Sequence, residues 1–210
     1  MVVFENISEE LAEAIVYEKG YELATEIVNL LREEGKVVAF AESCTGGFLA
    51  KRITDIPGSS EVFNCSIVSY TNEIKNKVLG VREKTLYKFT AVSRECAMEM
   101  ANGVRMLSGA DYGVSVTGYA GNGDGDEVGV IYIGLSSEKG TSAILLNTGI
   151  RGDNCREKNR MLAVRSAFNN LKEMIISDAS VTTAVVTLWK RLHLGTQMNY
   201  PIGSGERRVV

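Results

Sequence analysis

The sequence has few of the residue types that build metal centres, disulfide frameworks and histidine-based catalytic sites. Its 210 residues include one histidine, His193, and four cysteines. The cysteines, Cys44, Cys65, Cys96 and Cys155, are irregularly spaced and form no C-x-x-C pair. We therefore expect no metal ion or disulfide framework. Reduced thiols are typical of the cytoplasm, which is the location that we expect.

Long apolar runs and blocks of one charge are also missing. No run approaches the ~18 apolar residues that a membrane-spanning helix needs. The first 16 residues mix acidic with apolar side chains and lack the cationic start of a secretory signal. The net charge of −3 argues against a nucleic-acid-binding surface. We expect a globular domain that binds neither membrane nor nucleic acid.

Helical and strand-like patterns alternate along most of the chain. Helical spacing predicts helices over 8–34, 48–56, 71–81, 93–110 and 156–175, with Gly20 as a candidate break in the first. Apolar and β-branched runs predict strands over 37–40, 63–70, 111–118, 128–135 and 141–148. This order predicts an α/β fold, a three-layer α/β/α sandwich with a mixed, mostly parallel sheet.

We expect two parts in the chain. Residues 1–176 form the domain, and residues 177–210 form an extra, partly flexible C-terminal segment. In that segment residues 180–194 have a strand-like composition, and residues 199–210 have the composition of a flexible tail. The apolar stretch 185–194 also favours a homo-oligomer.

Three turns rich in glycine and hydroxyl groups adjoin predicted strands or helices. They are AESCTGG (41–47), GSS (58–60) and TGYAG (117–121). Ligands of open α/β sheets bind where such turns gather at strand ends. The first turn has three interpretations: a nucleophile on a tight turn, a phosphate cradle at a helix N-terminus, or a helix cap. The Walker and Rossmann signatures are absent from the sequence.

Several motifs, in order and spacing, resemble the C-terminal domain of the CinA (competence/damage-inducible protein) family over roughly residues 22–176. The segments that carry the resemblance are AESCTGG (41–47), TDIPGSS (54–60), YTNEIKNKVLGV (70–81), AVS (91–93) and TGYAG (117–121). Enzymatic members of the family are nicotinamide-nucleotide amidases. The resemblance implies hydrolysis of nicotinamide mononucleotide to nicotinic acid mononucleotide and ammonia, without a metal or organic cofactor. The alternative is a CinA-like domain that has lost hydrolysis and serves as a nucleotide-binding or assembly module.

Amide hydrolysis requires a nucleophile, a base that later protonates the leaving ammonia, and donors for the oxyanion. Since His193 lies outside the resembling region, a serine–lysine pair replaces a histidine triad in our interpretation. A desolvated lysine has a lowered pKa and can act as the base. Ser60 and Lys75 form the leading pair, Tyr70 orients or relays the proton, and Ser43 is the competing nucleophile. Taken singly, Ser60 is better explained as a helix cap and Lys75 as a solvated helix residue.

The 5′-phosphate of such a substrate needs N–H donors or a guanidinium group. The candidate substrate-binding residues are Thr45, Gly46, Gly47, Thr117, Gly118 and Arg156. We interpret Cys44 as structural, because a thiol is nucleophilic only when acidified.

The sequence departs from the family pattern at two places. The loop after TGYAG is short, lacks both of the usual prolines, and adds the carboxylates of Asp124, Asp126 and Glu127 near the expected anion site. The family's G-D-R motif has two extra residues before Arg156, which leaves Arg151 as the alternative arginine.

Overall fold

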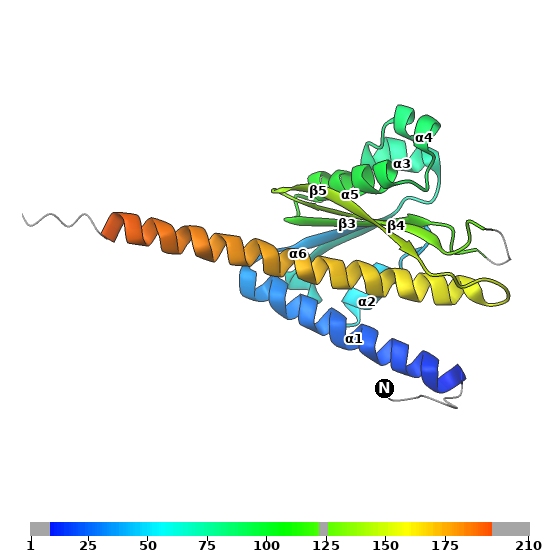
Figure 1. Ribbon diagram of the computed structural model, residues 1–210, viewed down its shortest axis with the longest axis horizontal. Coiled ribbons are helices and arrows are strands. Elements are labelled where there is room, and N and C mark those ends of the chain that lie inside the picture. Colours follow the sequence, from blue (N-terminus) through cyan, green and yellow to red (C-terminus); the bar gives the residue numbers. More distant parts are fainter. Residues whose placement is uncertain (1–8, 122–125, 195–210) are drawn as a thin grey trace, which may run out of the picture. The chain divides into compact units, whose positions relative to one another are not determined.

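The computed structural model describes the backbone of residues 9–121 and 126–194, and the side chains of residues 20–121 and 126–180. The chain divides into two compact units, Met1–Ile175 and Ile176–Val210. The first unit has a five-stranded sheet between two layers of helices (Figure 1). The predicted α/β fold is confirmed.

The sheet has the strand order β2-β1-β3-β4-β5. Its strands are β1 (Val38–Glu42), β2 (Phe63–Val68), β3 (Tyr112–Gly118), β4 (Val130–Ser137) and β5 (Gly140–Asn147). β1 pairs in parallel with both β2 and β3. β4 is antiparallel to β3 and to β5. All strands except β4 therefore run in one direction, and the carboxyl ends of β1, β2 and β3 meet at one edge of the sheet.

Six helices and one 3₁₀ turn accompany the sheet in the described part of the chain. They are α1 (Glu9–Glu34), α2 (Phe48–Thr54), η1 (Ser59–Glu61), α3 (Asn72–Leu79), α4 (Glu83–Phe89), α5 (Arg94–Ser108) and α6 (Cys155–Leu194). Sequence patterns predicted all of the helices except α4, which is seven residues long.

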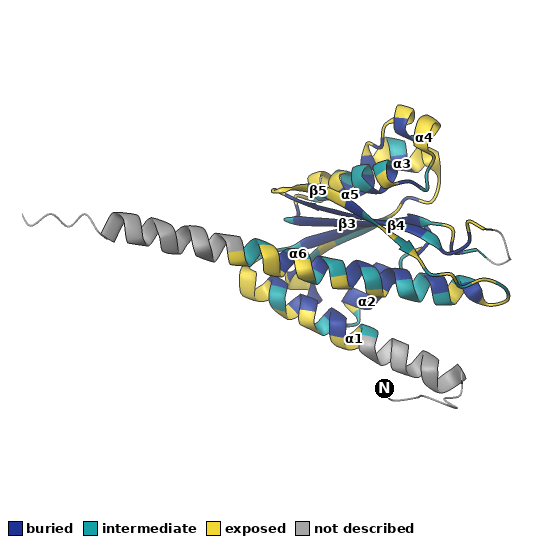
Figure 2. Ribbon diagram, in the orientation of Figure 1, coloured by how far each residue is buried: buried dark blue, intermediate teal, exposed yellow. Residues whose placement is uncertain are grey.

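Buried residues lie in the sheet and in the helices that cover it (Figure 2). The residues of β1 divide between two hydrophobic cores, one on each face of the sheet. Val38 and Phe40 belong to the core formed with α1, α2 and the first part of α6. Ala39 and Ala41 belong to the second core, formed with α5. Because side chains alternate along a strand, consecutive residues at the end of β1 also face opposite layers.

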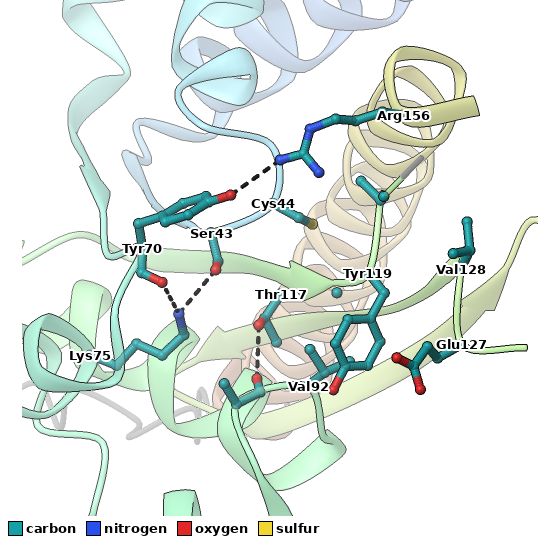
Figure 3. Close-up of a pocket in the computed structure, with 14 residues that line it drawn as sticks. Ser43, Cys44, Tyr70, Lys75, Val92, Thr117, Tyr119, Glu127, Val128 and Arg156 are labelled. Carbon is teal, nitrogen blue, oxygen red and sulfur yellow. Dashed lines mark hydrogen bonds between the residues drawn. The ribbon is translucent and has the colours of Figure 1, made fainter. Parts of the chain in front are cut away.

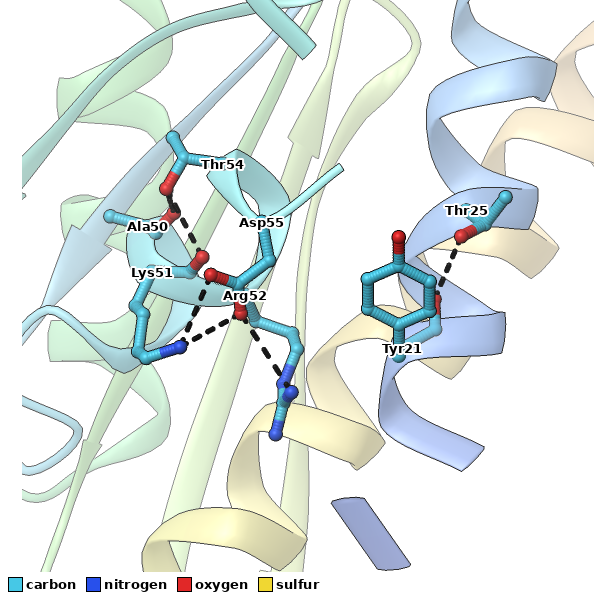
Figure 4. A network of polar contacts seen from close by, with 7 residues as sticks. All are labelled: Tyr21, Thr25, Ala50, Lys51, Arg52, Thr54 and Asp55. Atoms are coloured by element: carbon cyan, nitrogen blue, oxygen red, sulfur yellow. Dashed lines mark hydrogen bonds and ion pairs between the residues drawn. The ribbon is translucent and has the colours of Figure 1, made fainter. Parts of the chain in front are cut away.

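Helix α1 continues through Gly20, so the expected break at this glycine is wrong. A Cβ atom at Gly20 would lie 3.6 Å from Nε of Arg52 on α2. Arg52 is 3% exposed and its Nη1 lies 3.8 Å from Oδ2 of Asp55 (Figure 4). Lys51 Nζ also donates to the Asp55 carboxylate, at 2.8 Å. These ion pairs lie within α2 and its C-cap residue Asp55, while the Arg52 side chain packs beside Gly20 of α1.

The strand-like composition of residues 180–194 does not produce a strand, because α6 extends to Leu194. Extending an existing helix needs no new nucleus, and β-branched residues lower helix propensity by only ~0.5 kcal/mol each. The expected tail at 199–210 lies outside the described residues. No helix among the described residues combines the length and apolar character required to cross a bilayer.

Candidate functional site

A pocket of about 380 Å³ opens where β1, β2 and β3 end. Ser43 directly follows β1, Tyr70 lies between β2 and α3, and Thr117 and Gly118 end β3. Figure 3 shows the polar side chains from these segments turned toward the pocket. Its polar lining residues are Ser43, Cys44, Tyr70, Lys75, Thr117, Tyr119, Glu127 and Arg156.

Lys75 meets Ser43 at the floor of the pocket. Thr71 caps α3 by accepting a hydrogen bond from the Ile74 N–H at 3.3 Å, which places Lys75 in the first turn of the helix. The Lys75 side chain is 1% exposed, and its Nζ lies 3.0 Å from Ser43 Oγ. The structure therefore joins a nucleophile candidate and a base candidate within hydrogen-bond distance.

The surroundings of Lys75 make its amine easier to deprotonate than that of an exposed lysine. Burial lowers the pKa of Lys75 below its ordinary value of 10.5. Nζ donates to the backbone carbonyl oxygens of Ser69, at 2.7 Å, and Tyr70, at 3.4 Å. A neutral amine has two N–H donors for these two carbonyls and one lone pair. In the structure Nζ also donates to Ser43 Oγ; once the amine is deprotonated, its lone pair is able to accept the Ser43 hydroxyl proton.

Ser60 does not form the expected pair with Lys75. Ser60 lies in η1, before β2, whereas Lys75 follows β2. Strand β2 has six residues and so spans roughly 20 Å. Ser60 and Lys75 therefore lie at opposite ends of this strand. Ser60 is also exposed and does not line the pocket. We correct the assignment: the serine beside Lys75 is Ser43, the second candidate from sequence.

The glycine turn after Ser43 does not cradle an external anion. The buried carboxylate of Glu42 already occupies the N-terminus of α2. It accepts hydrogen bonds of 2.9, 3.0, 3.0 and 2.9 Å from Gly47 N, Leu49 N, Ala50 N and Ser66 Oγ.

The other groups of this turn are directed away from the pocket as well. Gly46 N donates to Ser43 O at 3.1 Å, and Thr45 O accepts from Arg160 Nη2 at 2.6 Å. None of Thr45, Gly46 and Gly47 lines the pocket. The glycines instead allow the tight turn, with φ of 61° and 99°. The expected phosphate cradle is replaced by an internal cap.

Arg156 is the arginine that reaches the pocket. It lies in the first turn of α6, and its Nη2 donates to Tyr70 Oη at 3.1 Å. The alternative, Arg151, is held by Asp126 through a 3.5 Å ion pair. The hydroxyl of Tyr70 thus faces the guanidinium group, while only its backbone carbonyl contacts Lys75. This geometry favours a binding role for the Tyr70 side chain over proton relay.

Thr117 and Gly118 line the pocket at the end of β3. The Thr117 hydroxyl donates to Ala91 O at 2.8 Å, which ties β3 to the loop before α5. A Cβ atom at Gly118 would lie 2.7 Å from Ile131 Cα. Glycine at this position is required by the close approach of β4.

Cys44 lies beside Ser43, but burial raises the pKa of its thiol to about 11. The thiol stays protonated at neutral pH and is a poor nucleophile. The structural role expected for Cys44 agrees with this environment. No group of three or more potential metal ligands occurs among the residues that the structure describes.

Sequence reasoning missed Glu42 and Arg160, which position the site without lining it. The signal for Glu42 was its place at the end of a buried strand, where β1 alternation puts it on the same face as Phe40 and α2. The same alternation puts Ser43 on the opposite face, toward the second core. Arg160 is one helical turn after Arg156, on the same side of α6.

Comparisons with known proteins agree with this architecture. The CinA C-terminal domain model matches residues 20–175. A CinA-like protein from Endomicrobium trichonymphae is 47% identical over 162 residues, covering 75% of this chain and 37% of that protein. A putative competence-damage inducible protein from Halothermothrix orenii is 45% identical over 170 residues, covering 79% and 40%. The chain thus spans about two fifths of the length of these relatives.

Solved structures share the fold. A CinA superfamily protein from Klebsiella pneumoniae has a TM-score of 0.70 at 30% identity and covers 75% of this chain and 98% of its own. The competence/damage-inducible protein CihA from Agrobacterium tumefaciens has a TM-score of 0.68 at 35% identity and covers 84% and 98%. By sequence, motif order and fold, the chain belongs to the CinA C-terminal domain family.

Proposed function

We propose that this chain is an amidohydrolase that converts nicotinamide mononucleotide to nicotinic acid mononucleotide and ammonia, with Ser43 as nucleophile and Lys75 as base. The observation that carries the proposal is the 3.0 Å contact between Lys75 Nζ and Ser43 Oγ in the pocket. The substrate is proposed from the resemblance to the enzymatic members of the family, and the geometry supports hydrolysis by side chains alone.

In the first step, the neutral Lys75 amine takes the Ser43 hydroxyl proton as Oγ attacks the carboxamide carbon. The new bond joins Ser43 Oγ to that carbon, and the carbonyl π electrons move to oxygen. The peptide N–H of Cys44, which follows the nucleophile, is our candidate donor to this oxyanion. Lys75 then protonates the leaving nitrogen, the C–N bond breaks, and ammonia departs from an acyl-Ser43 ester.

In the second step, Lys75 is neutral again and acts as base for a water molecule. The hydroxide oxygen bonds to the acyl carbon, the ester bond to Ser43 breaks, and Oγ recovers a proton from Lys75. Nicotinic acid mononucleotide is released, and the site returns to its starting state. No metal ion takes part in either step.

Arg156 is our candidate for the phosphate site, in place of the glycine turn. Its guanidinium lines the pocket and carries a permanent positive charge. The hydrogen bond to Tyr70 Oη orients it across the pocket from α6. We expect Arg156→Ala to raise KM for the mononucleotide more than it lowers kcat, because the phosphate is remote from the reacting carbon.

The test is ammonia release from nicotinamide mononucleotide by the purified chain, in buffer with and without a chelator. We expect turnover that the chelator leaves unchanged, and a loss of about 10²- to 10⁴-fold in kcat for Lys75→Ala. Lys77→Ala is the matched control, since Lys77 lies on the same helix and pairs with Glu73 at the surface. Absence of turnover by the parent chain refutes hydrolysis and favours the alternative, a CinA-like domain that binds nucleotide or serves in assembly.

A further inference from the structure

The pocket carries opposite charges on different sides. Arg156 extends from α6, and Glu127 extends from the segment before β4 (Figure 3). Lys75, which also lines the pocket, is buried beneath them and donates hydrogen bonds to Ser43 Oγ and to two backbone carbonyls. A ligand that satisfies both sides therefore needs an anionic group for Arg156 and a cationic group for Glu127.

Glu127 is available for such a ligand. No ion pair or hydrogen bond joins its carboxylate to another residue in the part of the chain that the structure describes. The neighbouring carboxylate, Asp126, is different: it pairs with Arg151 and does not line the pocket. The two consecutive acids thus have the same charge but different positions relative to the pocket.

We propose that Glu127 is a specificity residue that selects ligands with a cationic, N-substituted pyridine ring. This inference rests on the proposed function, because it takes the nicotinamide mononucleotide ring as the cation. The substrate then matches the pocket in charge: its phosphate faces Arg156, its ring faces Glu127, and its carboxamide reaches Ser43. Tyr119, which also lines the pocket and is 41% exposed, offers an aromatic face to the same ring.

The proposal predicts that the effect of Glu127 depends on the charge of the ligand ring and on no other group of the ligand. The reduced, 1,4-dihydro form of nicotinamide mononucleotide keeps the carboxamide, ribose and phosphate, but its ring is uncharged. Glu127 is solvent-exposed, so its attraction for a cation is that of an exposed ion pair, about three- to fivefold in Kd. The dihydro ligand gains nothing from this carboxylate.

The experiment measures Kd by calorimetry for both ligands in the Ser43→Ala protein, in which no hydrolysis interferes. The protein is compared with and without Glu127→Gln. Asp126→Asn is the matched control, because it removes the same charge one residue away. We expect Glu127→Gln to weaken binding of the cationic ligand about three- to fivefold and to change the dihydro ligand by less than twofold. Asp126→Asn changes neither ligand by more than twofold.

Three results overturn the proposal: equal effects of Glu127→Gln on both ligands, no effect on either, or an equal effect of Asp126→Asn. Failure of either ligand to bind Ser43→Ala protein overturns it as well. The proposed function is judged separately, by ammonia release from the chain with Ser43 intact. If the chain releases ammonia from the mononucleotide but Glu127→Gln leaves ligand binding unchanged, only the present inference is refuted.

Discussion

Replacing Glu42 by glutamine tests the claim that a carboxylate, rather than a bound phosphate, closes the N-terminus of α2. Glu42 is fully buried. Its Oε2 accepts from Gly47 N and Leu49 N, and its Oε1 accepts from Ala50 N and Ser66 Oγ. Glutamine has nearly the same shape, but one of the two acceptor oxygens becomes an NH₂ donor.

The cost of Glu42→Gln follows from these contacts. The favourable amide orientation keeps the oxygen toward Gly47 and Leu49 and turns NH₂ toward Ser66, whose hydroxyl is able to accept. The Ala50 N–H is then left without a partner, at about 2 kcal/mol. Loss of the negative charge at the helix N-terminus adds about 1 kcal/mol. A total near 3 kcal/mol lowers the melting temperature by roughly 6 to 12 °C for a domain of this size.

Urea unfolding followed by circular dichroism measures the change in free energy of unfolding. Glu61→Gln is the control, because Glu61 forms a surface ion pair with Arg32 and we expect it to change stability by less than ~1 kcal/mol. A Glu42→Gln protein as stable as the Glu61→Gln protein refutes the internal cap. We also expect Glu42→Gln to lower kcat, since Glu42 holds the turn that presents Ser43.

Three further outcomes are expected. The kcat/KM for ammonia release rises with pH through an apparent pKa below 10.5, since burial lowers the pKa of Lys75 and the neutral amine is the base; a rise centred at or above 10.5 contradicts this. Iodoacetamide labels Cys44 about a hundredfold more slowly than an ordinary thiol, because the pKa of the Cys44 thiol is about 11 instead of 9.0. Peptide mass spectrometry measures the labelling rate, and labelling of Cys44 at the rate of an ordinary thiol contradicts this expectation. Gly134→Ala lowers the free energy of unfolding, measured in urea, by roughly 2 kcal/mol, because the added Cβ would overlap the Ala97 carbonyl and lie 2.5 Å from Ser115 Oγ; an unchanged free energy of unfolding contradicts the close packing of α5 on β4.

The sequence predicted the sheet and its main helices because their signals are local. Residues 63–70 and 111–118, for example, became β2 and β3 with boundaries shifted by at most two residues. The predicted helix break at Gly20 and the strand-like interpretation of residues 180–194 were wrong for the same reason. Local composition did not reveal Arg52, which packs beside Gly20, or the long helix that continues into the C-terminal segment.

The site was harder to predict because it depends on which end of a strand each turn adjoins. Ser60 and Ser43 both lie in small-residue turns, but Ser60 precedes β2 and Ser43 follows β1. In parallel strands these positions lie at opposite edges of the sheet. The glycine turn was similarly ambiguous: strand alternation indicates which face Glu42 is on, but the hydrogen bonds from its carboxylate to the N-terminus of α2 became evident only in the structure.

The most direct test of the catalytic assignment is ammonia release from nicotinamide mononucleotide by Ser43→Ala and Ser60→Ala proteins, measured side by side with the parent. The two changes remove the same hydroxyl group from the two serines considered. We predict that Ser43→Ala lowers kcat at least ~10³-fold, while Ser60→Ala keeps turnover within about twofold of the parent because Ser60 is exposed and lies outside the pocket. A Ser43→Ala protein that hydrolyses the substrate at the parent rate contradicts the account.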